Sequence, residues 1–373
     1  MHNSAGETMK VRVQFDWVLV ATIALLVGVS LLELYSISLA RPSVAGSAWR
    51  QGLFAVVSMG VMLFLSTIDY RVLRKRHTRV LYFGTLFALG LVLVAGTNVR
   101  GTVGWIVIGP FSLQVVEFAK VAMIIFLAGF IAAKQTVFGP GGRLVVSLVL
   151  LCVVVALVLA QPDFGSAMIL LALWFGMSFV SGMRRVHMVL MVGAIVLAGV
   201  GTWFMLADYQ RDRVLAFVNP YVDPQGSGYN VIQAMIAVGS GGLTGKGLGH
   251  GTQSQLGFLP ESHTDFIFAV IAEEFGLFGA LFVLGLYGVM LVRLWRIALR
   301  APTNFSYLIV SGVMMMFFVQ VLINVGMNLG IMPVTGIPLP FVSYGGSSLL
   351  ASSIAVGLVL SIDRVTRRTQ NIV

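Results

Sequence analysis

The sequence has 373 residues, of which 58% are hydrophobic and only 10% are charged, and its mean hydropathy is +0.95. Because soluble proteins carry about 25% charged residues, this composition excludes a soluble globular protein and predicts a membrane protein that crosses the bilayer many times. The net charge of +10 could suggest nucleic-acid binding, but the basic residues lie in short connections between apolar segments. That pattern is typical of topology signals and of contact with anionic membrane lipids, so we expect no nucleic-acid partner.

Ten apolar segments are long enough to be transmembrane helices. In chain order, we place them at 17–38, 52–67, 80–96, 114–133, 144–160, 166–182, 188–206, 276–295, 305–331 and 341–361. The first is too long for the hydrophobic region of a signal peptide, so we interpret it as an uncleaved anchor. The expected fold class is an all-α polytopic membrane protein with ten transmembrane helices. A large extracytoplasmic loop between helices 7 and 8 is expected to contain interfacial or re-entrant segments.

The basic residues orient these spans. With the N-terminus inside, seventeen Lys and Arg residues fall in inner loops and six in outer loops, and Lys120 alone lies within a span. The excess of positive charge on one side predicts that both termini are cytoplasmic. We therefore expect a cytoplasmic tail over 1–16, a single membrane domain over 17–363 with the extracytoplasmic loop at 207–275, and a cytoplasmic tail over 364–373.

The fourth predicted span carries ionisable residues. Gln114, Glu117 and Lys120 are three residues apart and share one helix face. Because this span enters from outside, Lys120 is expected to lie roughly 10 Å below the outer surface. Ionisable groups at that depth are usually functional, although a purely structural ion pair is the alternative.

Two further polar features lie near the same membrane face. Asp163, in QPDFG, follows the fifth span and is either a cap for the next helix or an acid of the site. Gln320, Asn324 and Asn328 recur every four residues in the ninth span. That spacing suggests interhelical hydrogen bonds as readily as a substrate groove.

The large loop contains the glycine-rich run GSGGLTGKGLGHG at 239–251. It is not a phosphate-binding P-loop, because Lys246 is followed by Gly247 rather than by Ser or Thr. Either the glycines permit the tight turns of a flexible or re-entrant loop, or the exposed backbone amides bind a substrate diphosphate.

The loop ends in FLPESHTDFIFAVIAEE, at 258–274. Thr264 is predicted to cap a short interfacial helix that starts near Asp265, and Gly276 is predicted to open the eighth span. Asp265 is either a solvated acid that is favourable to the helix dipole or a catalytic base. We expect Glu273 and Glu274 to face protein or water and to have a structural role, because buried charges in lipid are costly.

Four motifs in this sequence resemble those of the SEDS family (shape, elongation, division and sporulation), and the resemblance covers nearly the whole chain. They are EFAK, QPDFGSA, FVNPYVDPQGSGYNVIQAMIAVGSGGLTGKGLGHGTQSQLGFLPESHTDFIFAVIAEEFG and PVTGIPLPFVSYGGSS. The stretch PVTGIPLPF is similar to the RodA branch rather than to the division paralogue FtsW. One departure concerns the family pattern G-x-x-R-W…Q-P-S-E-x-x-K. Here Gly104 replaces the arginine, and Val115 and Val116 replace Pro and Ser; Arg100 could substitute for the missing arginine.

The resemblance implies a peptidoglycan glycosyltransferase of the bacterial inner membrane that acts in elongation and shape maintenance. Family members polymerise lipid II at the outer face, with a class B penicillin-binding protein as partner in the elongation machinery. The essential aspartate of the family corresponds to Asp265, its glutamate and lysine to Glu117 and Lys120, and the acid after the fifth span to Asp163. Four other residues in the matching region are expected to contact the substrate, namely Arg100, Lys246, His263 and Ser343.

The expected chemistry is glycosyl transfer. A sugar hydroxyl must lose its proton as it attacks an anomeric carbon, and this requires a carboxylate base, here Asp265. A diphosphate leaving group needs a cation, supplied by Lys120 or by a divalent metal such as Mg or Mn; no cofactor is otherwise expected. The alternative is a lipid II flippase, but transporters place charged sites near the bilayer midplane, whereas these charges lie in the outer half. A catalytically silent scaffold would not need Glu117 and Lys120 buried in a span.

Overall fold

The computed structural model describes residues 16–41, 44, 46–73, 76–99, 101–109, 111–133, 140–183, 186, 189, 193, 217, 219–226 and 228–370. The helices described are α1 Trp17–Ala40, α2 Ser47–Thr67, α3 Arg76–Ala95, α4 Val115–Ala132, α5 Pro140–Leu159, α6 Phe164–Val180, α9 Tyr229–Ser240, α10 Thr252–Gln255, α11 Ile267–Arg300, α12 Asn304–Asn328 and α13 Gly346–Gln370. Short 3₁₀ turns occur at Tyr70–Leu73 and Pro220–Val222.

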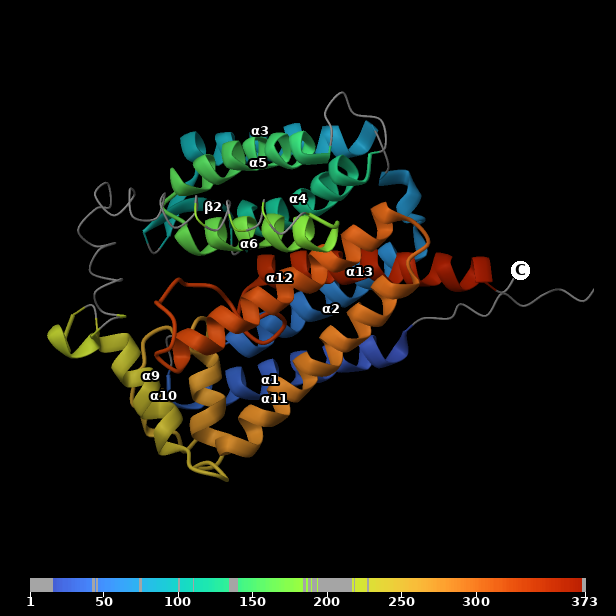
Figure 1. Cartoon of the computed structure of the whole chain (residues 1–373). Coiled ribbons are helices and arrows are strands. Elements are labelled where there is room, and N and C mark those ends of the chain that lie inside the picture. Colours follow the sequence, from blue (N-terminus) through green and yellow to red (C-terminus); the bar gives the residue numbers. More distant parts are fainter. Residues whose placement is uncertain are drawn as a thin grey trace, which may run out of the picture.

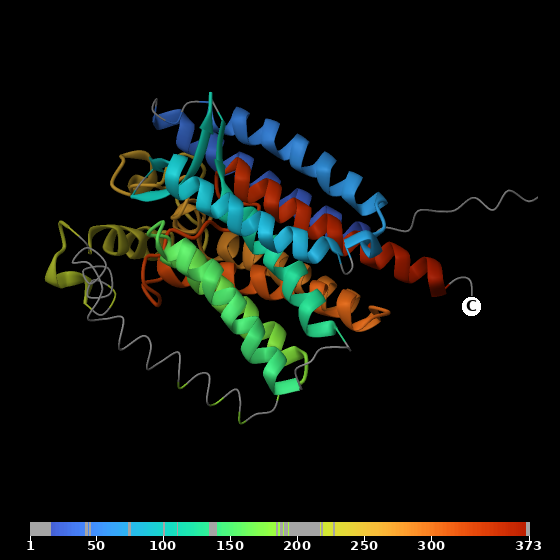
Figure 2. The ribbon, with the colours of Figure 1, turned by 90° about the horizontal axis from the view of Figure 1, so that it is seen from above.

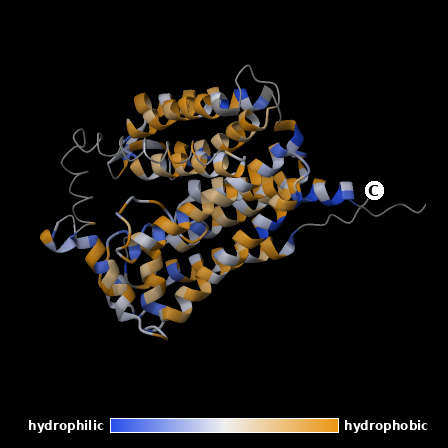
Figure 3. Ribbon diagram, viewed as in Figure 1, coloured by the Kyte–Doolittle hydropathy of each residue, from blue (hydrophilic) through white to orange (hydrophobic). Residues whose placement is uncertain are grey.

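The prediction of a polytopic helical membrane protein is confirmed. Eight helices in the described part of the chain are long and apolar enough to cross a bilayer, and α6, with 17 residues, is a shorter apolar helix. The predicted span at 188–206 lies outside the described residues, apart from 189 and 193. The long helices form a bundle, with β2, α9 and α10 towards one end and the C-terminus at the other (Figures 1 and 2). Hydrophobic residues run along the bundle, and hydrophilic residues gather in the loops beside α9 and at the end of α13 (Figure 3).

A small antiparallel sheet, absent from the sequence prediction, joins α3 to α4. Its strands are β1 Thr97–Val99, β2 Thr102–Ile108 and β3 Phe111–Gln114, in the order β1-β2-β3. Trp105 pairs with Gln114 across β2 and β3. The β-branched run at 106–108 followed by Gly109 is typical of a hairpin. Because β3 runs directly into α4, the sheet fixes where Gln114 and the first turn of α4 lie.

One predicted helix start and one predicted cap are wrong. The last span starts at Gly346 rather than at 341, because Phe341 follows Pro340 and has a positive φ of 65° that ends regular structure there. The helix expected to start near Asp265 starts at Ile267, and Thr264 does not cap it. The Thr264 hydroxyl instead donates to the Glu261 carboxylate, at 3.0 Å.

The predicted junction at Gly276 is confirmed as a break within α11. Gly276 has φ 65° and ψ −160°, which are not helical values. The amides of Leu277 and Phe278 are thereby released from the helix and donate to the carbonyls of Gly242 (2.9 Å) and Leu243 (3.2 Å). The break thus couples α11 to the glycine-rich loop.

At the end of the bundle away from α9, an ionic cluster ties three helices together. Asp16, at the start of α1, accepts from Arg293 of α11 (Nε to Oδ2, 2.9 Å), and Arg367 of α13 donates to Asp363 (2.8 Å). Arg367 also lies 3.9 Å from Asp16. Asp16 is the last residue of the predicted tail at 1–16, and it is buried and bonded.

Candidate active site

Four helices begin around one polar region. α4, α6, α11 and α13 start at Val115, Phe164, Ile267 and Gly346, and contacts described below link these four starts to one another. Each is an even-numbered span in the predicted order, so all should enter the membrane from the same face. The amino ends of helices carry partial positive charge and favour anions.

Glu117 and Lys120 of α4 form a buried ion pair. Lys120 Nζ donates to Glu117 Oε1 at 2.7 Å, and the two side chains are only 1% and 4% exposed, respectively. An ammonium group has three donors, and Glu117 is the one partner that the described residues give it. A buried pair of this kind contributes little net stability, so structure alone is a weak reason for its presence.

Asp163 has the predicted capping role, and its role as an acid of the site stays a prediction. It is the N-cap of α6, where Oδ1 accepts from the amide of Ser166 at 2.9 Å. Its other oxygen, Oδ2, accepts from Gln114 Nε2 at 3.4 Å. The start of α6 is therefore joined to the start of α4, one turn before Glu117.

Asp265 is held in place through its main chain. Its carbonyl oxygen accepts from Asn324 Nδ2 (3.0 Å) and from Asn328 Nδ2 (3.1 Å), and Asn328 Oδ1 accepts from the amide of Ala269 (3.1 Å). Asn324 and Asn328 therefore make the predicted interhelical bonds, whereas the buried Gln320 Oε1 has no hydrogen-bond partner among the described residues. Asn328 supplies the cap that Thr264 does not. The Asp265 side chain is half-buried.

A connecting segment, residues 333–347, links the turn at Asp265 to the other helix starts. Ser343 donates to the carbonyl of Thr264 (2.6 Å), and the amide of Tyr344 donates to the carbonyl of His263 (2.9 Å). A Cβ on Gly336 would lie 3.7 Å from Asp265 Oδ2. Ser343 thus positions the turn that carries His263 and Asp265, and its hydroxyl is used within the protein.

The same segment reaches the other helix starts. A Cβ on Gly165, in the first turn of α6, would lie 2.7 Å from the carbonyl oxygen of Thr335, so only glycine fits there. Ser347, in the first turn of α13, accepts from the amide of Gln114 (2.9 Å). Residues 333–347 therefore contact the regions of Glu117, Asp163 and Asp265.

The glycine-rich loop folds onto two buried carboxylates of α11. Glu273 accepts from Lys246 Nζ (2.9 Å) and from the amides of Gln253 (2.9 Å) and Ser254 (3.1 Å), and Glu274 accepts from the amide of Gly249 (3.1 Å). Both glutamates face protein, as expected, and their bonds hold the glycine-rich loop against α11. Because the loop amides bond to this chain, the turn interpretation of the glycines is favoured over diphosphate binding.

The predicted site residues are not all brought together. Lys246 belongs to the Glu273 cluster, and a substrate contact by Lys246 stays a prediction. His263 lies beside Tyr344, with ring centroids 5.7 Å apart. Arg100 lies outside the described residues. No three His, Cys, Asp or Glu side chains gather as a metal site within the ranges that the structure describes.

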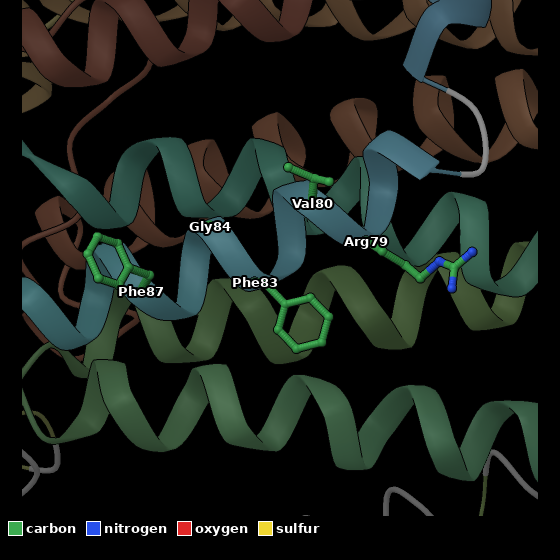
Figure 4. A pocket seen from close by; sticks show the side chains of 5 residues that line it. All are labelled: Arg79, Val80, Phe83, Gly84 and Phe87. Carbon is green, nitrogen blue, oxygen red and sulfur yellow. The ribbon is translucent and has the colours of Figure 1, made fainter.

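A hollow on the outside of α3 lies apart from these residues. It has a volume of about 710 Å³ and is lined by Arg79, Val80, Phe83, Gly84 and Phe87 (Figure 4). All five lie on one stripe of a single helix. The lining is mostly apolar, so it fits a lipid chain better than the polar chemistry of glycosyl transfer.

Comparison with known proteins identifies the family. A family model described as "Cell cycle protein", which covers FtsW, RodA and SpoVE, matches residues 13–368. The chain belongs to this family. Stage V sporulation protein E of Bacillus subtilis is 39% identical over 362 residues, covering 94% of this chain and 98% of the relative. Peptidoglycan glycosyltransferase MrdB of Escherichia coli K12 is 41% identical over 310 residues, covering 82% and 83%.

Solved structures agree. The crystal structure of Thermus thermophilus rod shape determining protein RodA matches with a TM-score of 0.71 at 31% identity, covering 95% of this chain and 98% of that one. A chain from a peptidoglycan synthase complex, described for its coordination of polymerisation and crosslinking, matches with a TM-score of 0.78 at 35% identity, covering 94% and 98%. The resemblance to a RodA-like SEDS enzyme, and the class of peptidoglycan glycosyltransferase, are confirmed.

Within this SEDS site, three polar residues were missed by the sequence analysis. Gln51 of α2 donates to the carbonyl of Ser343 (3.2 Å) and accepts from the amide of Gly345 (3.2 Å), and Ser347 joins α13 to β3 and α4. Gln161 is fully buried, and a Cβ on Gly104 would lie 3.2 Å from its Oε1. The glycine at the family's arginine position therefore faces a buried amide. Gln51 lies just before the predicted second span and Gln161 just after the fifth, so neither stood out as a polar residue within a span.

Proposed function

We propose that this chain polymerises lipid II into glycan strands at the outer face of the bacterial inner membrane, with Asp265 as the general base. The strongest observation in favour of this role is that two buried asparagines of α12 hold the main chain of Asp265 at the start of α11. The helix starts linked to it carry Asp163 and the buried Glu117–Lys120 pair. A general base must be held at a fixed place beside the reacting hydroxyl.

In the proposed reaction, the Asp265 carboxylate takes the proton of the acceptor sugar hydroxyl. The hydroxyl oxygen forms a bond to the anomeric carbon of the donor, while the bond from that carbon to the diphosphate oxygen breaks. The lipid diphosphate leaves as an anion. Lys120, with donors beyond the one used by Glu117, and the amino ends of four helices stabilise that negative charge.

The proposed topology has ten spans, with both termini in the cytoplasm and the active face outside. It is supported by the excess of basic residues on the side of the ionic cluster and by the contacts that bring the starts of α4, α6, α11 and α13 together. We also propose a class B penicillin-binding protein of the elongation machinery as partner. One similar structure is a complex that coordinates polymerisation with crosslinking.

A divalent cation, Mg or Mn, fits this proposal as a companion of the substrate diphosphate. Magnesium is usually held by one or two carboxylates together with substrate phosphates. We assign the binding of this cation to the Asp163 carboxylate, which lies at the start of α6 beside Gln114. The cation would add positive charge beside the leaving group.

The first prediction is that Asp265→Asn abolishes polymerisation. The amide keeps the size of the side chain but cannot accept the proton. A general base typically contributes about 10²–10⁴-fold to the rate, so glycan chains should be nearly undetectable when purified lipid II is incubated with the variant and its partner.

The matched control is Asp223→Asn, the same change at an exposed aspartate near Pro220–Val222, and it should keep wild-type activity. Both variants should insert and melt as the wild type does. Polymerisation by Asp265→Asn at close to the wild-type rate would refute the base assignment. A flippase, by contrast, predicts a defect in lipid II translocation together with normal polymerisation by a separate enzyme.

A further inference from the structure

The turn that precedes Asp265 is strained. Glu261 has a φ of +51°, in the left-handed region that residues other than glycine rarely adopt. Its carbonyl accepts from the amides of Thr264 (3.1 Å) and Phe266 (3.3 Å), on either side of Asp265. Its carboxylate accepts from the Thr264 hydroxyl at 3.0 Å. Strain of this kind costs about 1–3 kcal/mol and is concentrated at functional sites.

An arginine from a distant part of the chain holds the same turn. Arg41 follows the last residue of α1, and its Nη1 donates to Ser262 Oγ (3.2 Å) while its Nη2 donates to the carbonyl of Leu259 (3.1 Å). Gly257 lies beside the guanidinium, and its φ of +82° is a backbone conformation that favours glycine. Burial lowers the pKa of Arg41, and the negative charge of Glu261 opposes that change.

We infer that Arg41 and Glu261 are positioning residues, which hold the turn 259–264 so that Asp265 has the geometry required for proton transfer. This inference rests on the proposed role of Asp265 as base. Arg41 braces the turn against α1, which packs along α11. The main-chain carbonyl of Glu261 binds the two amides that flank Asp265, and its carboxylate holds the Thr264 hydroxyl. A misplacement of about 1 Å in a catalytic group can cost 10²-fold in rate, so bracing of this turn has a large effect.

The arginine arm of the test compares Arg41→Gln, Arg41→Lys and Arg50→Gln in lipid II polymerisation. Arg41→Gln should lower kcat on the order of 10- to 100-fold without changing KM, and hydrogen exchange at the amides of Thr264 and Phe266 should quicken. Arg41→Lys should give an intermediate kcat, because an ammonium keeps the charge but not the forked geometry. Arg50, an exposed arginine at the start of α2, is the matched control and should change neither readout.

The glutamate arm separates the carboxylate from the backbone. Glu261→Gly should lower kcat while the midpoint of thermal unfolding stays or rises, because glycine adopts the positive φ without strain. Glu261→Ala should lower both, because it keeps the strain and loses the carboxylate. A residue that only stabilised the fold would not separate kcat from thermal stability in this way.

Two results would overturn the inference, namely wild-type kcat in Arg41→Gln and wild-type kcat in Glu261→Gly. If Arg41→Gln combined unchanged kcat with a raised KM, Arg41 would instead be a substrate-binding residue. Asp265→Asn in the same assay keeps the two proposals apart. An inactive Asp265→Asn beside a fully active Arg41→Gln refutes the positioning role alone, whereas an active Asp265→Asn refutes the base assignment itself.

Discussion

At the scale of single residues, the Glu117–Lys120 pair separates structural from catalytic roles. Exchanging the two residues, Glu117→Lys with Lys120→Glu, keeps a pair of opposite charges three residues apart. If the pair were only structural, the exchanged protein should retain most of its activity. Because a diphosphate clamp needs the cation at position 120, we expect loss of polymerisation with a largely preserved fold, measured by lipid II turnover and thermal unfolding.

The single variant Lys120→Ala is the comparison for that exchange. It leaves Glu117 charged and unpaired in the interior, a change that typically costs about 3–5 kcal/mol. It should therefore lose both activity and stability, whereas the exchange should lose activity alone. Near-normal glycan synthesis by the exchanged protein would refute the clamp.

The ionisable residues of the candidate site were predicted from the sequence, but the residues that hold them in place through hydrogen bonds were not. The three-residue spacing was enough to pair Glu117 with Lys120, because a helix has a fixed period. The asparagines of α12 were recognised as interhelical donors, but their target, the carbonyl of Asp265, lies about sixty residues away in sequence. No local pattern predicts such a contact.

At the scale of elements, the break in α11 at Gly276 can be tested by substitution. Gly276→Ala should destabilise the protein by about 1–3 kcal/mol, because the positive φ is strained for alanine and its Cβ would lie 2.6 Å from the carbonyl oxygen of Leu243. Thermal unfolding and proteolysis within the loop at 241–255 would report the change. The loop should be cut faster because its bonds to Leu277 and Phe278 depend on the break.

Gly285→Ala in the same helix is the control. Gly285 is exposed, and a Cβ there meets nothing within 4 Å. Alanine is the better helix former, so this variant should be neutral or slightly stabilised. Equal destabilisation by both substitutions would show that the break has no special role.

Helices and strands were predicted well where hydrophobicity determines their bounds, and poorly where turns determine them. The spans could be placed because twenty apolar residues have few alternatives in a bilayer. The sheet at 97–114 was missed because its short strands lie between two long apolar runs. The start of α13 was placed five residues early because Phe341 and Val342 continue the apolar pattern, although the backbone has already turned.

At the scale of the whole molecule, the orientation can be tested by thiol labelling. In a Cys152→Ser background, a cysteine at Gln225 should react with a membrane-impermeant reagent added to intact cells, and a cysteine at Val72 should react only after lysis. Both positions are exposed, so accessibility does not distinguish them. Labelling of the Val72 variant in intact cells, without labelling at Gln225, would reverse the proposed active face.

Because residues 333–347 link the helix starts, the site can assemble only late in synthesis of the chain. Gln114 is made more than two hundred residues before Ser347, and Gln51 almost three hundred before Ser343. Until residues 333–347 have left the ribosome, α2, α4 and the turn at Asp265 lack the partners that join them. Gln51 and the amide of Gln114 therefore lack these partners while the later spans are made, and a ribosome stalled before this segment would leave an inserted protein whose site is not assembled.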